Sequence, residues 1–318
     1  MTLVQDISAA APRIAPFIRR TPLAHSASLS KRTGVEVYLK LENYQITGSF
    51  KARGAMNRLQ VIHEASGASG VVAASSGNHG MAVAWAARTL GLAARVCVPE
   101  VAVQSKIDRI RGYGAEVIVH GADCVDAEAH ARTLSEADGL PYVSPYNDYD
   151  VMCGQGTAGV EIADQADAFD SVYVAMGGGG LIGGVGAYLK AVSPNTRMVG
   201  CSPSQSPALH ECLEAKTIID VPCHSTISDA TAGGVESGAV TFPVCQEVVD
   251  ESLLLDEAEI KEAFRGFMAD HPMLIEGAAA VTIAGFLQSA GNRQGSRVCI
   301  LLCGANIGTE KLGSLLAD

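Results

Sequence analysis

The sequence has few basic and few aromatic residues. Its 23 lysines and arginines stand against 34 acidic residues, a formal net charge of −11, and aromatic residues make up only 5%. An acidic chain without basic runs is a poor partner for nucleic acid or an anionic membrane, because both carry negative charge. No apolar run reaches the roughly 20 residues that a membrane-spanning helix needs. We therefore expect neither nucleic acid nor a membrane as a partner.

Paired cysteine motifs are also missing. The nine cysteines are scattered without a CxxC pair or a His/Cys cluster, and several lie in apolar runs. This pattern is typical of reduced, mostly buried thiols rather than of a disulfide framework or a zinc site. The first 16 residues lack the basic start and apolar block of a signal peptide. We expect a cytoplasmic protein.

The chain is rich in short apolar runs that alternate with helical patterns. Its 318 residues, 48% of them hydrophobic, suffice for one large or two modest domains. Residues 70–74 are typical of a buried strand and precede a helical pattern at 81–90. Residues 171–176 are a second such strand, before a helix that ends at Val192. This alternation predicts parallel βαβ units and an α/β fold.

One lysine stands where a Gly/Ser/Thr-rich turn gives way to a helical pattern. Residues 47–55 read TGSFKARGA, with Lys51 at the junction. A lysine becomes a nucleophile when burial or positive potential, such as that of a helix start, lowers its pKa. Most lysines are exposed, so on its own this one is also compatible with an ordinary surface position.

Two further turns follow predicted strands. Residues 75–80 read SSGNHG, and such a donor-rich turn at a helix start suits an anion such as a carboxylate. A plain helix cap is the alternative there, since Ser and Asn favour that position. Residues 177–184 read GGGGLIGG, where successive N–H groups can surround a phosphate.

The glycine run also matches GxGxxG, counted from Gly178, which is the pattern of dinucleotide-binding proteins. That pattern needs an acidic residue about 20 positions further on. Residues 199–202 read VGCS and supply none, so a single phosphate fits better than NAD, and a nucleotide-binding oxidoreductase is the weaker reading. A nucleophilic lysine combined with a single-phosphate turn indicates a covalently held aldehyde cofactor, pyridoxal phosphate.

Taken together, the motifs resemble those of the fold-type II pyridoxal phosphate enzymes, in the serine/threonine dehydratase and serine racemase family. The resemblance runs over nearly the whole chain, in family order: KLEN at 40–43, TGSFK at 47–51, SSGNHG at 75–80, GQGT at 154–157, GGGGL at 177–181 and CGAN at 303–306. It implies two doubly wound α/β domains with pyridoxal phosphate in the cleft between them. The large domain would comprise residues 1–63 and 149–318, and a small mobile domain residues 64–148.

The resemblance also implies roles for individual residues. Lys51 would form the internal Schiff base and, when freed, remove the Cα proton of the substrate. The substrate carboxylate would bind to Ser75, Ser76, Gly77, Asn78 and His79. The other cofactor contacts would be Phe50 beside the ring, Asn78 on the phenolic oxygen, Cys303 at the pyridine nitrogen, and the phosphate-binding N–H groups of Gly177, Gly178, Gly179, Gly180 and Leu181.

In the resemblance, the residue type at Cys303 affects which reaction the cofactor favours. A neutral thiol is a poor proton source, so it would leave the ring nitrogen unprotonated and favour elimination of a β-hydroxyl over a long-lived carbanion. By residue type alone, Cys303 is equally compatible with a buried strand position. The implied reaction converts a β-hydroxy amino acid to a 2-keto acid and ammonia.

Two alternatives stay open. Ser76 falls where racemising relatives carry a serine on the opposite face of the substrate, so a racemase that uses Lys51 and Ser76 as its two bases is one alternative. A pyridoxal phosphate-binding protein without turnover is the other. The family is often dimeric, and the expectation of a homodimer comes from the resemblance only.

The sequence departs from the family in two places. Relatives with a divalent cation use a Glu-Pro pair and a following acid, where this chain has Ser202-Pro203 and Pro207-Ala208. Hard cations prefer oxygen ligands, so we predict no metal site. Residues 229–236 also differ from the commonest family version, which suggests a pocket for a larger side chain, such as that of 3-hydroxyaspartate or phenylserine. Glu236 is either a substrate contact or a solvated loop acid.

Overall fold

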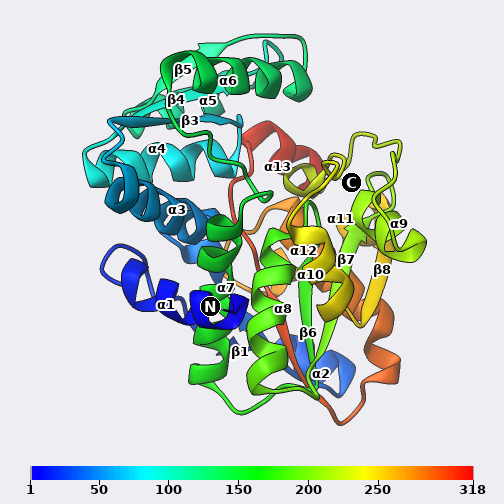
Figure 1. Cartoon of the computed structure of the whole chain (residues 1–318). Helices are drawn as coiled ribbons and strands as arrows, with labels where there is room; N and C mark the ends of the chain where they lie inside the picture. The colour runs from blue at the N-terminus through cyan, green and yellow to red at the C-terminus, as the bar shows by residue number, and fades with distance from the viewer. Residues whose placement is uncertain (1, 318) are drawn as a thin grey trace.

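A six-stranded sheet forms the centre of the larger part of the molecule. The computed structural model describes residues 2–317 (Figure 1). The strands follow the order β1-β2-β9-β6-β7-β8, and neighbouring strands are parallel except for the antiparallel pair of β1 and β2. Their bounds are β1 Leu23–His25, β2 Glu36–Lys40, β6 Ser171–Ala175, β7 Arg197–Pro203, β8 Glu251–Leu255 and β9 Arg297–Leu301. The predicted α/β fold is confirmed.

A second, three-stranded parallel sheet lies at the top of Figure 1. Its strands follow the order β3-β4-β5, and α4, α5 and α6 pack around it. The bounds are β3 Gly70–Ala74, α4 Asn78–Leu90, β4 Ala93–Val98, α5 Gln104–Gly112, β5 Glu116–Val119 and α6 Cys124–Asp138. All of these elements fall within residues 64–148. That this range forms a mobile domain stays a prediction.

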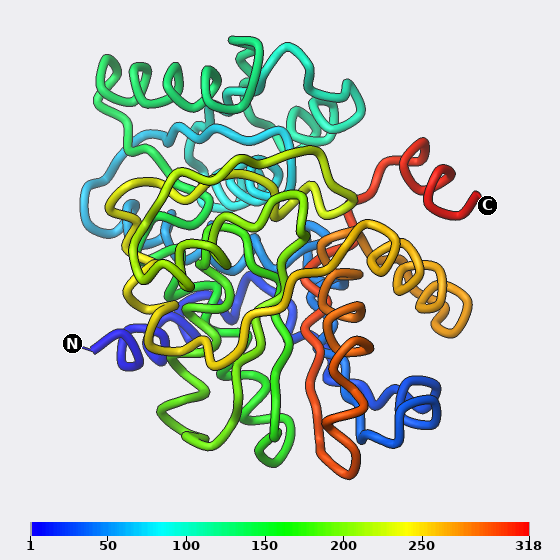
Figure 2. Tube along the Cα trace, turned by 90° about the vertical axis from the view of Figure 1, so that its right-hand side faces the viewer, coloured from blue at the N-terminus to red at the C-terminus, as the bar shows by residue number. Residues whose placement is uncertain are grey.

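The remaining helices surround the large sheet. Figure 2 shows α7 and α8 on one side of it and α11 and α12 on the other. α12 contacts β6, β7, β8 and β9, while α7 packs against α8. The bounds are α1 Leu3–Ile14, α2 Ala27–Thr33, α3 Lys51–Ser66, α7 Tyr149–Gln165, α8 Gly180–Val192, α9 Ala208–Ala215, α10 Thr241–Val248, α11 Glu257–Asp270, α12 Gly277–Ser289 and α13 Thr309–Leu316. Single 3₁₀ turns are η1 Glu42–Tyr44, η2 Asp229–Thr231 and η3 Ala290–Asn292.

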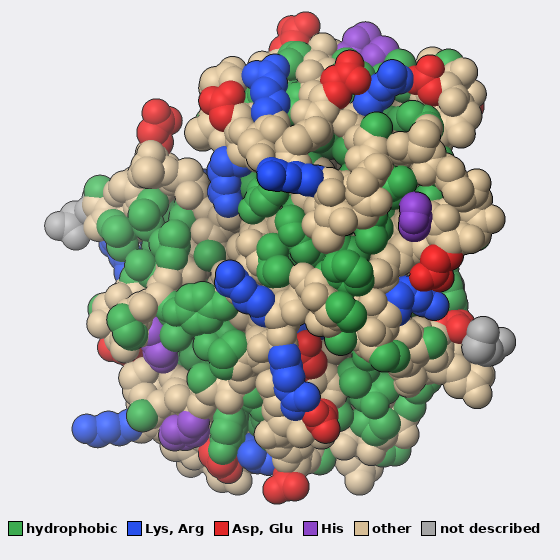
Figure 3. All heavy atoms as spheres, turned by 90° about the vertical axis from the view of Figure 1, so that its left-hand side faces the viewer, with side chains coloured by type: hydrophobic (Ala, Val, Ile, Leu, Met, Phe, Trp, Pro, Cys, Tyr) green, Lys and Arg blue, Asp and Glu red, His purple; other side chains and the backbone are tan. Residues whose placement is uncertain are grey.

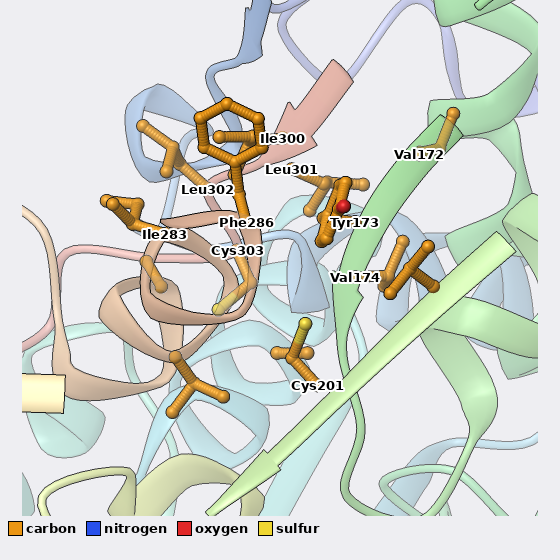
Figure 4. Packing of buried hydrophobic residues seen from close by; sticks show 14 of the residues in the cluster. Val172, Tyr173, Val174, Cys201, Ile283, Phe286, Ile300, Leu301, Leu302 and Cys303 are labelled. Carbon is orange, nitrogen blue, oxygen red and sulfur yellow. The ribbon is translucent and has the colours of Figure 1, made fainter. Parts of the chain in front are cut away.

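The main hydrophobic core surrounds the large sheet and includes buried residues of α8, α11 and α12. Tyr173 of β6 meets Phe286 of α12 edge to face, with ring centroids 5.7 Å apart (Figure 4). The Tyr173 hydroxyl lies 2.6 Å from the Ser289 hydroxyl, so its one polar atom is satisfied inside the core. Cys201 and Cys303 belong to the same core. Seven of the nine cysteines are buried, and within residues 2–317 all nine are free thiols.

The start of α7 differs from the sequence prediction. Residues 141–156 are polar and aromatic, which predicts a return loop, and the GQGT stretch at 154–157 is expected to open a helix that ends at Gln165. The helix begins at Tyr149, where the Asp148 side chain caps it by accepting the Val151 N–H at 3.0 Å. Its glycines serve close packing instead. A Cβ on Gly154 would lie 2.5 Å from the Arg53 carbonyl oxygen of α3.

The distribution of charge on the surface is relevant to the expectation about nucleic acid and membranes. On the face shown in Figure 3, basic side chains stand singly or in small groups among acidic and uncharged ones. No helix within residues 2–317 combines the length and the apolar composition needed to cross a membrane.

Candidate active site

Lys51 is the first residue of α3, and its amine points into the protein. Its Nζ donates a hydrogen bond to the Pro145 carbonyl oxygen at 2.7 Å and lies 5.1 Å from the centroid of the Phe50 ring. Burial lowers the pKa of Lys51 to about 8, although the neighbouring Cys303 and Glu276 act in the opposite direction. Near neutral pH this amine therefore exists in its nucleophilic form far more often than an ordinary surface lysine.

Backbone contacts hold the lysine turn against the end of β9. The Phe50 N–H donates to the Cys303 carbonyl oxygen at 3.0 Å, and Ser49 forms an isolated bridge with Gly304. Gly48 has a φ of +76°, which favours glycine. These contacts bring Cys303 beside Lys51 although about 250 residues separate them in the chain.

The glycine turn lies at the start of α8. Gly179 has a φ of +87° and caps the helix without a side-chain hydrogen bond, so the first N–H groups of α8 stay available for an anion. The two flanking glycines, Gly178 and Gly180, are packed too closely to carry side chains. A Cβ on Gly178 would lie 2.3 Å from the Tyr146 ring, and one on Gly180 would lie 2.5 Å from Gln155 Oε1.

Residues 75–77 connect β3 to α4, and residues 78 and 79 are the first two of that helix, which begins three residues earlier than predicted. The Ser75 hydroxyl accepts the Gly77 N–H at 3.1 Å. His79 is buried, with Nε2 2.8 Å from the Val143 carbonyl oxygen, and burial, reinforced by the charge of Lys51, lowers its pKa to about 3. His79 is thus a neutral imidazole. The Ser76 side chain makes no hydrogen bond within residues 2–317.

The structure adds a site residue that the sequence analysis missed. Glu276 occupies the N-cap position of α12, where its side chain makes no capping hydrogen bond, and it is almost fully buried. Its carboxylate accepts both hydrogen bonds from Asn78 Nδ2 at 3.0 Å, the Asn306 N–H at 3.1 Å and the Cys303 thiol at 3.7 Å. Burial raises the pKa of Glu276 to about 7.

A sequence signal for Glu276 existed. The glutamate directly precedes a run of small apolar residues, GAAAVTIAGF, which forms a buried helix. A carboxylate at such a position is unfavourable unless several donors satisfy it. Pro145 and Tyr146 were likewise missed, because the predicted return loop gave no reason to place Pro145 at Lys51 or Tyr146 at Gly178.

Cys303 is buried next to Glu276. Burial, together with the nearby carboxylate, raises the pKa of the Cys303 thiol well above its ordinary value. The thiol is therefore neutral. Its position against the ring nitrogen of a cofactor stays a prediction.

The residues around Lys51 fit pyridoxal phosphate. Ten buried polar side-chain atoms have no hydrogen-bond partner within residues 2–317, and four of them belong to the lysine turn, to the start of α4 and to α7: Thr47 Oγ1, Ser49 Oγ, His79 Nδ1 and Gln155 Oε1. Buried polar atoms are nearly always paired, so this group is consistent with a polar ligand. The glycine turn suits a phosphate, and Lys51 suits an aldehyde.

A match to a known protein family shows which family this chain belongs to. The family described as "Pyridoxal-phosphate dependent enzyme" matches residues 14–304. The chain belongs to this family. The predicted cofactor, pyridoxal phosphate, and the predicted resemblance are both confirmed.

Individual members show how close the similarity is. The chain is 36% identical over 311 residues to the L-threo-3-hydroxyaspartate ammonia-lyase of a Pseudomonas species, covering 98% of this chain and 97% of the relative. Among solved structures, the processed form of threonine deaminase isoform 2 from Solanum lycopersicum matches with a TM-score of 0.93 and 33% identity, over 98% and 91% of the two chains. A pyridoxal 5'-phosphate-dependent aspartate racemase matches with a TM-score of 0.91 and 33% identity, over 97% of each chain.

Proposed function

We propose that this protein is an ammonia-lyase that converts a β-hydroxy amino acid to the corresponding 2-keto acid and ammonia. The observation that carries the proposal is the desolvated Lys51 amine, with its pKa of about 8, beside the neutral Cys303 thiol. When bound, pyridoxal phosphate supplies an aldehyde for the substrate amine and an electron sink for the Cα–H bond. The names of the relatives support the same reaction class.

Lys51 is the base of this reaction. Its Nζ takes the Cα proton, and the β-hydroxyl leaves as water with one proton from the site. The enamine that results is released and reacts with water, which gives the 2-keto acid and ammonia. For 3-hydroxyaspartate the products are oxaloacetate and ammonia, so the water that is lost is regained and no oxidant is required.

The turn at residues 75–79 holds the substrate carboxylate. The first N–H groups of α4 point away from the helix and have no partner within it, and the positive end of the helix dipole favours an anion. The neutral His79 adds no charge, and Asn78 is fixed by Glu276. These contacts orient the Cα–H bond of the substrate toward Lys51.

Residues 64–148 form the small domain in this proposal, and the domain closes over bound substrate. Polar pairs span its border: Lys106 Nζ lies 3.1 Å from Asp229 Oδ2, and Arg132 Nη2 lies 3.0 Å from Glu236 Oε2. Exposed ion pairs contribute little free energy, so these pairs can break and form again when the domain moves. We also propose a homodimer, on the family resemblance.

Ammonia and keto-acid release from a panel of amino acids tests the function. The panel contains serine, threonine, 3-hydroxyaspartate and phenylserine in both stereochemical series. We expect rapid turnover of one member by the wild-type holoenzyme and none by Lys51→Ala. Silence across the panel from an enzyme that shows the absorption band of lysine-bound cofactor would overturn the proposal.

Racemisation is the second candidate. It is supported by the similarity to an aspartate racemase and by Ser76, whose side chain has no partner within residues 2–317. Chiral analysis of the amino acid pool during turnover tests it. If Ser76 is the second base, Ser76→Ala abolishes formation of the opposite enantiomer and keeps ammonia release.

A further inference from the structure

Helix α5 carries three basic side chains, Lys106, Arg109 and Arg111, and each has a different partner. Lys106 pairs with Asp229 at 3.1 Å, and Arg111 lies 3.8 Å from Asp108 of its own helix. Arg109 has no carboxylate within 4.0 Å in the part of the chain that the structure describes. Its Nη2 instead donates to the side-chain oxygen of Asn306 at 2.5 Å.

Asn306 connects Arg109 to the site. The Asn306 side chain donates to Asn78 Oδ1 at 2.6 Å and to the Thr47 carbonyl oxygen at 2.8 Å. The Arg109 guanidinium is therefore two hydrogen bonds away from Asn78, the first residue of α4. It lies at the edge of the turn that we propose for the substrate carboxylate.

The packing of α5 keeps Arg109 in this place. A Cβ on Gly80, in the first turn of α4, would lie 3.1 Å from Ile110 Cδ1. Ile110 follows Arg109 in the chain and is fully buried. The backbone that carries the guanidinium is thus anchored against α4, while the Arg109 side chain itself is exposed.

Most of the N–H donors of Arg109 have no hydrogen-bond partner within the described residues. A guanidinium has five N–H donors in a planar fork that matches a carboxylate, and the Asn306 contact uses one of them. The acids of the neighbouring 229–236 loop do not compete for it. Asp229 pairs with Lys106 and Lys311, and Glu236 pairs with Arg132. Glu276 contacts the backbone N–H of Asn306, not the oxygen that Arg109 binds.

We propose that Arg109 binds the side-chain carboxylate of the substrate, so that the enzyme prefers an acidic β-hydroxy amino acid of the 3-hydroxyaspartate class. This inference rests on the proposed function and names the substrate class of the same site. The 75–79 turn takes the α-carboxylate, and Arg109 takes the second carboxylate. Serine and threonine have no side-chain carboxylate, so Arg109 adds nothing to their binding.

A selectivity measurement tests this role. We would determine kcat/KM of the holoenzyme for 3-hydroxyaspartate and for serine or threonine in wild type, Arg109→Ala, Arg109→Lys and the control Arg111→Ala. We expect the ratio of kcat/KM for 3-hydroxyaspartate to that for serine to fall about 30-fold in Arg109→Ala, as for loss of a charged hydrogen-bonded pair. The fall should appear mainly in KM. Arg109→Lys should restore part of the ratio, and Arg111→Ala should retain it.

A second readout does not depend on turnover. Succinate should inhibit the wild-type holoenzyme competitively and more strongly than butyrate, and Arg109→Ala should remove that difference. An equal loss of kcat/KM for both substrates, with the succinate preference intact, would show that Arg109 only positions Asn306 and would overturn the inference.

The failures of the two proposals are distinguishable. A wild-type enzyme that turns over serine or threonine but not 3-hydroxyaspartate refutes the role of Arg109 and leaves the ammonia-lyase in place. A wild-type enzyme that turns over no β-hydroxy amino acid refutes the proposed function itself.

Discussion

The Asn78 amide donates to both oxygens of the Glu276 carboxylate, at 3.0 Å each. This contact joins the first residue of α4, which packs on the small sheet, to the N-cap residue of α12, which packs on the large sheet. Both residues are almost fully buried. Burial raises the pKa of Glu276 to about 7, which places its titration near neutral pH.

Glu276 should make stability depend on pH. Because its pKa is higher in the folded than in the unfolded state, its contribution is greatest below about pH 4.5 and is lost as pH rises through about 7. The unfolding free energy of wild type should fall by up to about 3 kcal/mol across this window, relative to Glu276→Gln. Urea unfolding of both proteins between pH 5 and 8 measures the difference. Parallel pH profiles would contradict the assigned pKa.

The glycine turn should tolerate no side chain at Gly178. Gly178→Ala introduces a Cβ 2.3 Å from the Tyr146 ring, so the ring must move and disturb the phosphate contact. We expect the apoprotein to bind pyridoxal phosphate about 10- to 100-fold more weakly, as for the loss of one or two charge-assisted hydrogen bonds.

Gly183→Ala is the matched control for Gly178→Ala. Gly183 lies in the first turn of α8, five residues after Gly178, and the nearest atom to a new Cβ there is 3.4 Å away. Absorbance titration of the apoproteins compares the two variants. Equal affinities would show that the turn does not bind the phosphate.

The buried ion pair of Arg53 and Glu42 should be essential for stability. Arg53 Nη2 lies 2.7 Å from Glu42 Oε1, and both side chains are completely buried. Glu42→Gln leaves the guanidinium without its full complement of negative charge, so we expect a loss of about 3–5 kcal/mol in unfolding free energy.

The exposed pair of Arg20 and Asp164 provides the control for that prediction. Both of its side chains are more than half exposed. Because surface pairs contribute little, Asp164→Asn should change the unfolding free energy by less than about 1 kcal/mol. Comparable losses in the two variants would mean that the buried network matters no more than a surface contact.

The sequence predicted those parts of the site that are local. A strand followed by a polar or glycine-rich turn and a helix is a short-range pattern, so β3 with the 75–80 turn and β6 with the 177–184 turn could be recognised before the structure was known. The family motifs then supplied the cofactor.

The parts that sequence reasoning missed depend on long-range contacts. Glu276 becomes a site residue only because α12 starts beside the end of β9. Arg109 reaches Asn306 across 197 positions of the chain. The start of α7 was misplaced because the polar and aromatic residues before Gly154 are typical of a loop, whereas α7 starts at Tyr149 and packs its glycines closely against α3 and α8. In each of these cases the outcome depends on tertiary packing, which a local sequence pattern does not contain.

The role of Lys51 is tested most directly by comparing Lys51→Ala with Lys190→Ala. Lys190 is a surface lysine paired with Asp250 and serves as the control. Each purified protein, loaded with pyridoxal phosphate, is measured for its visible absorption band and for ammonia release from the best β-hydroxy amino acid. We expect Lys51→Ala to lose the band of lysine-bound cofactor and at least about 1000-fold in rate, the range for removal of a general base, while Lys190→Ala retains both. An unchanged band or undiminished ammonia release in Lys51→Ala would contradict the account.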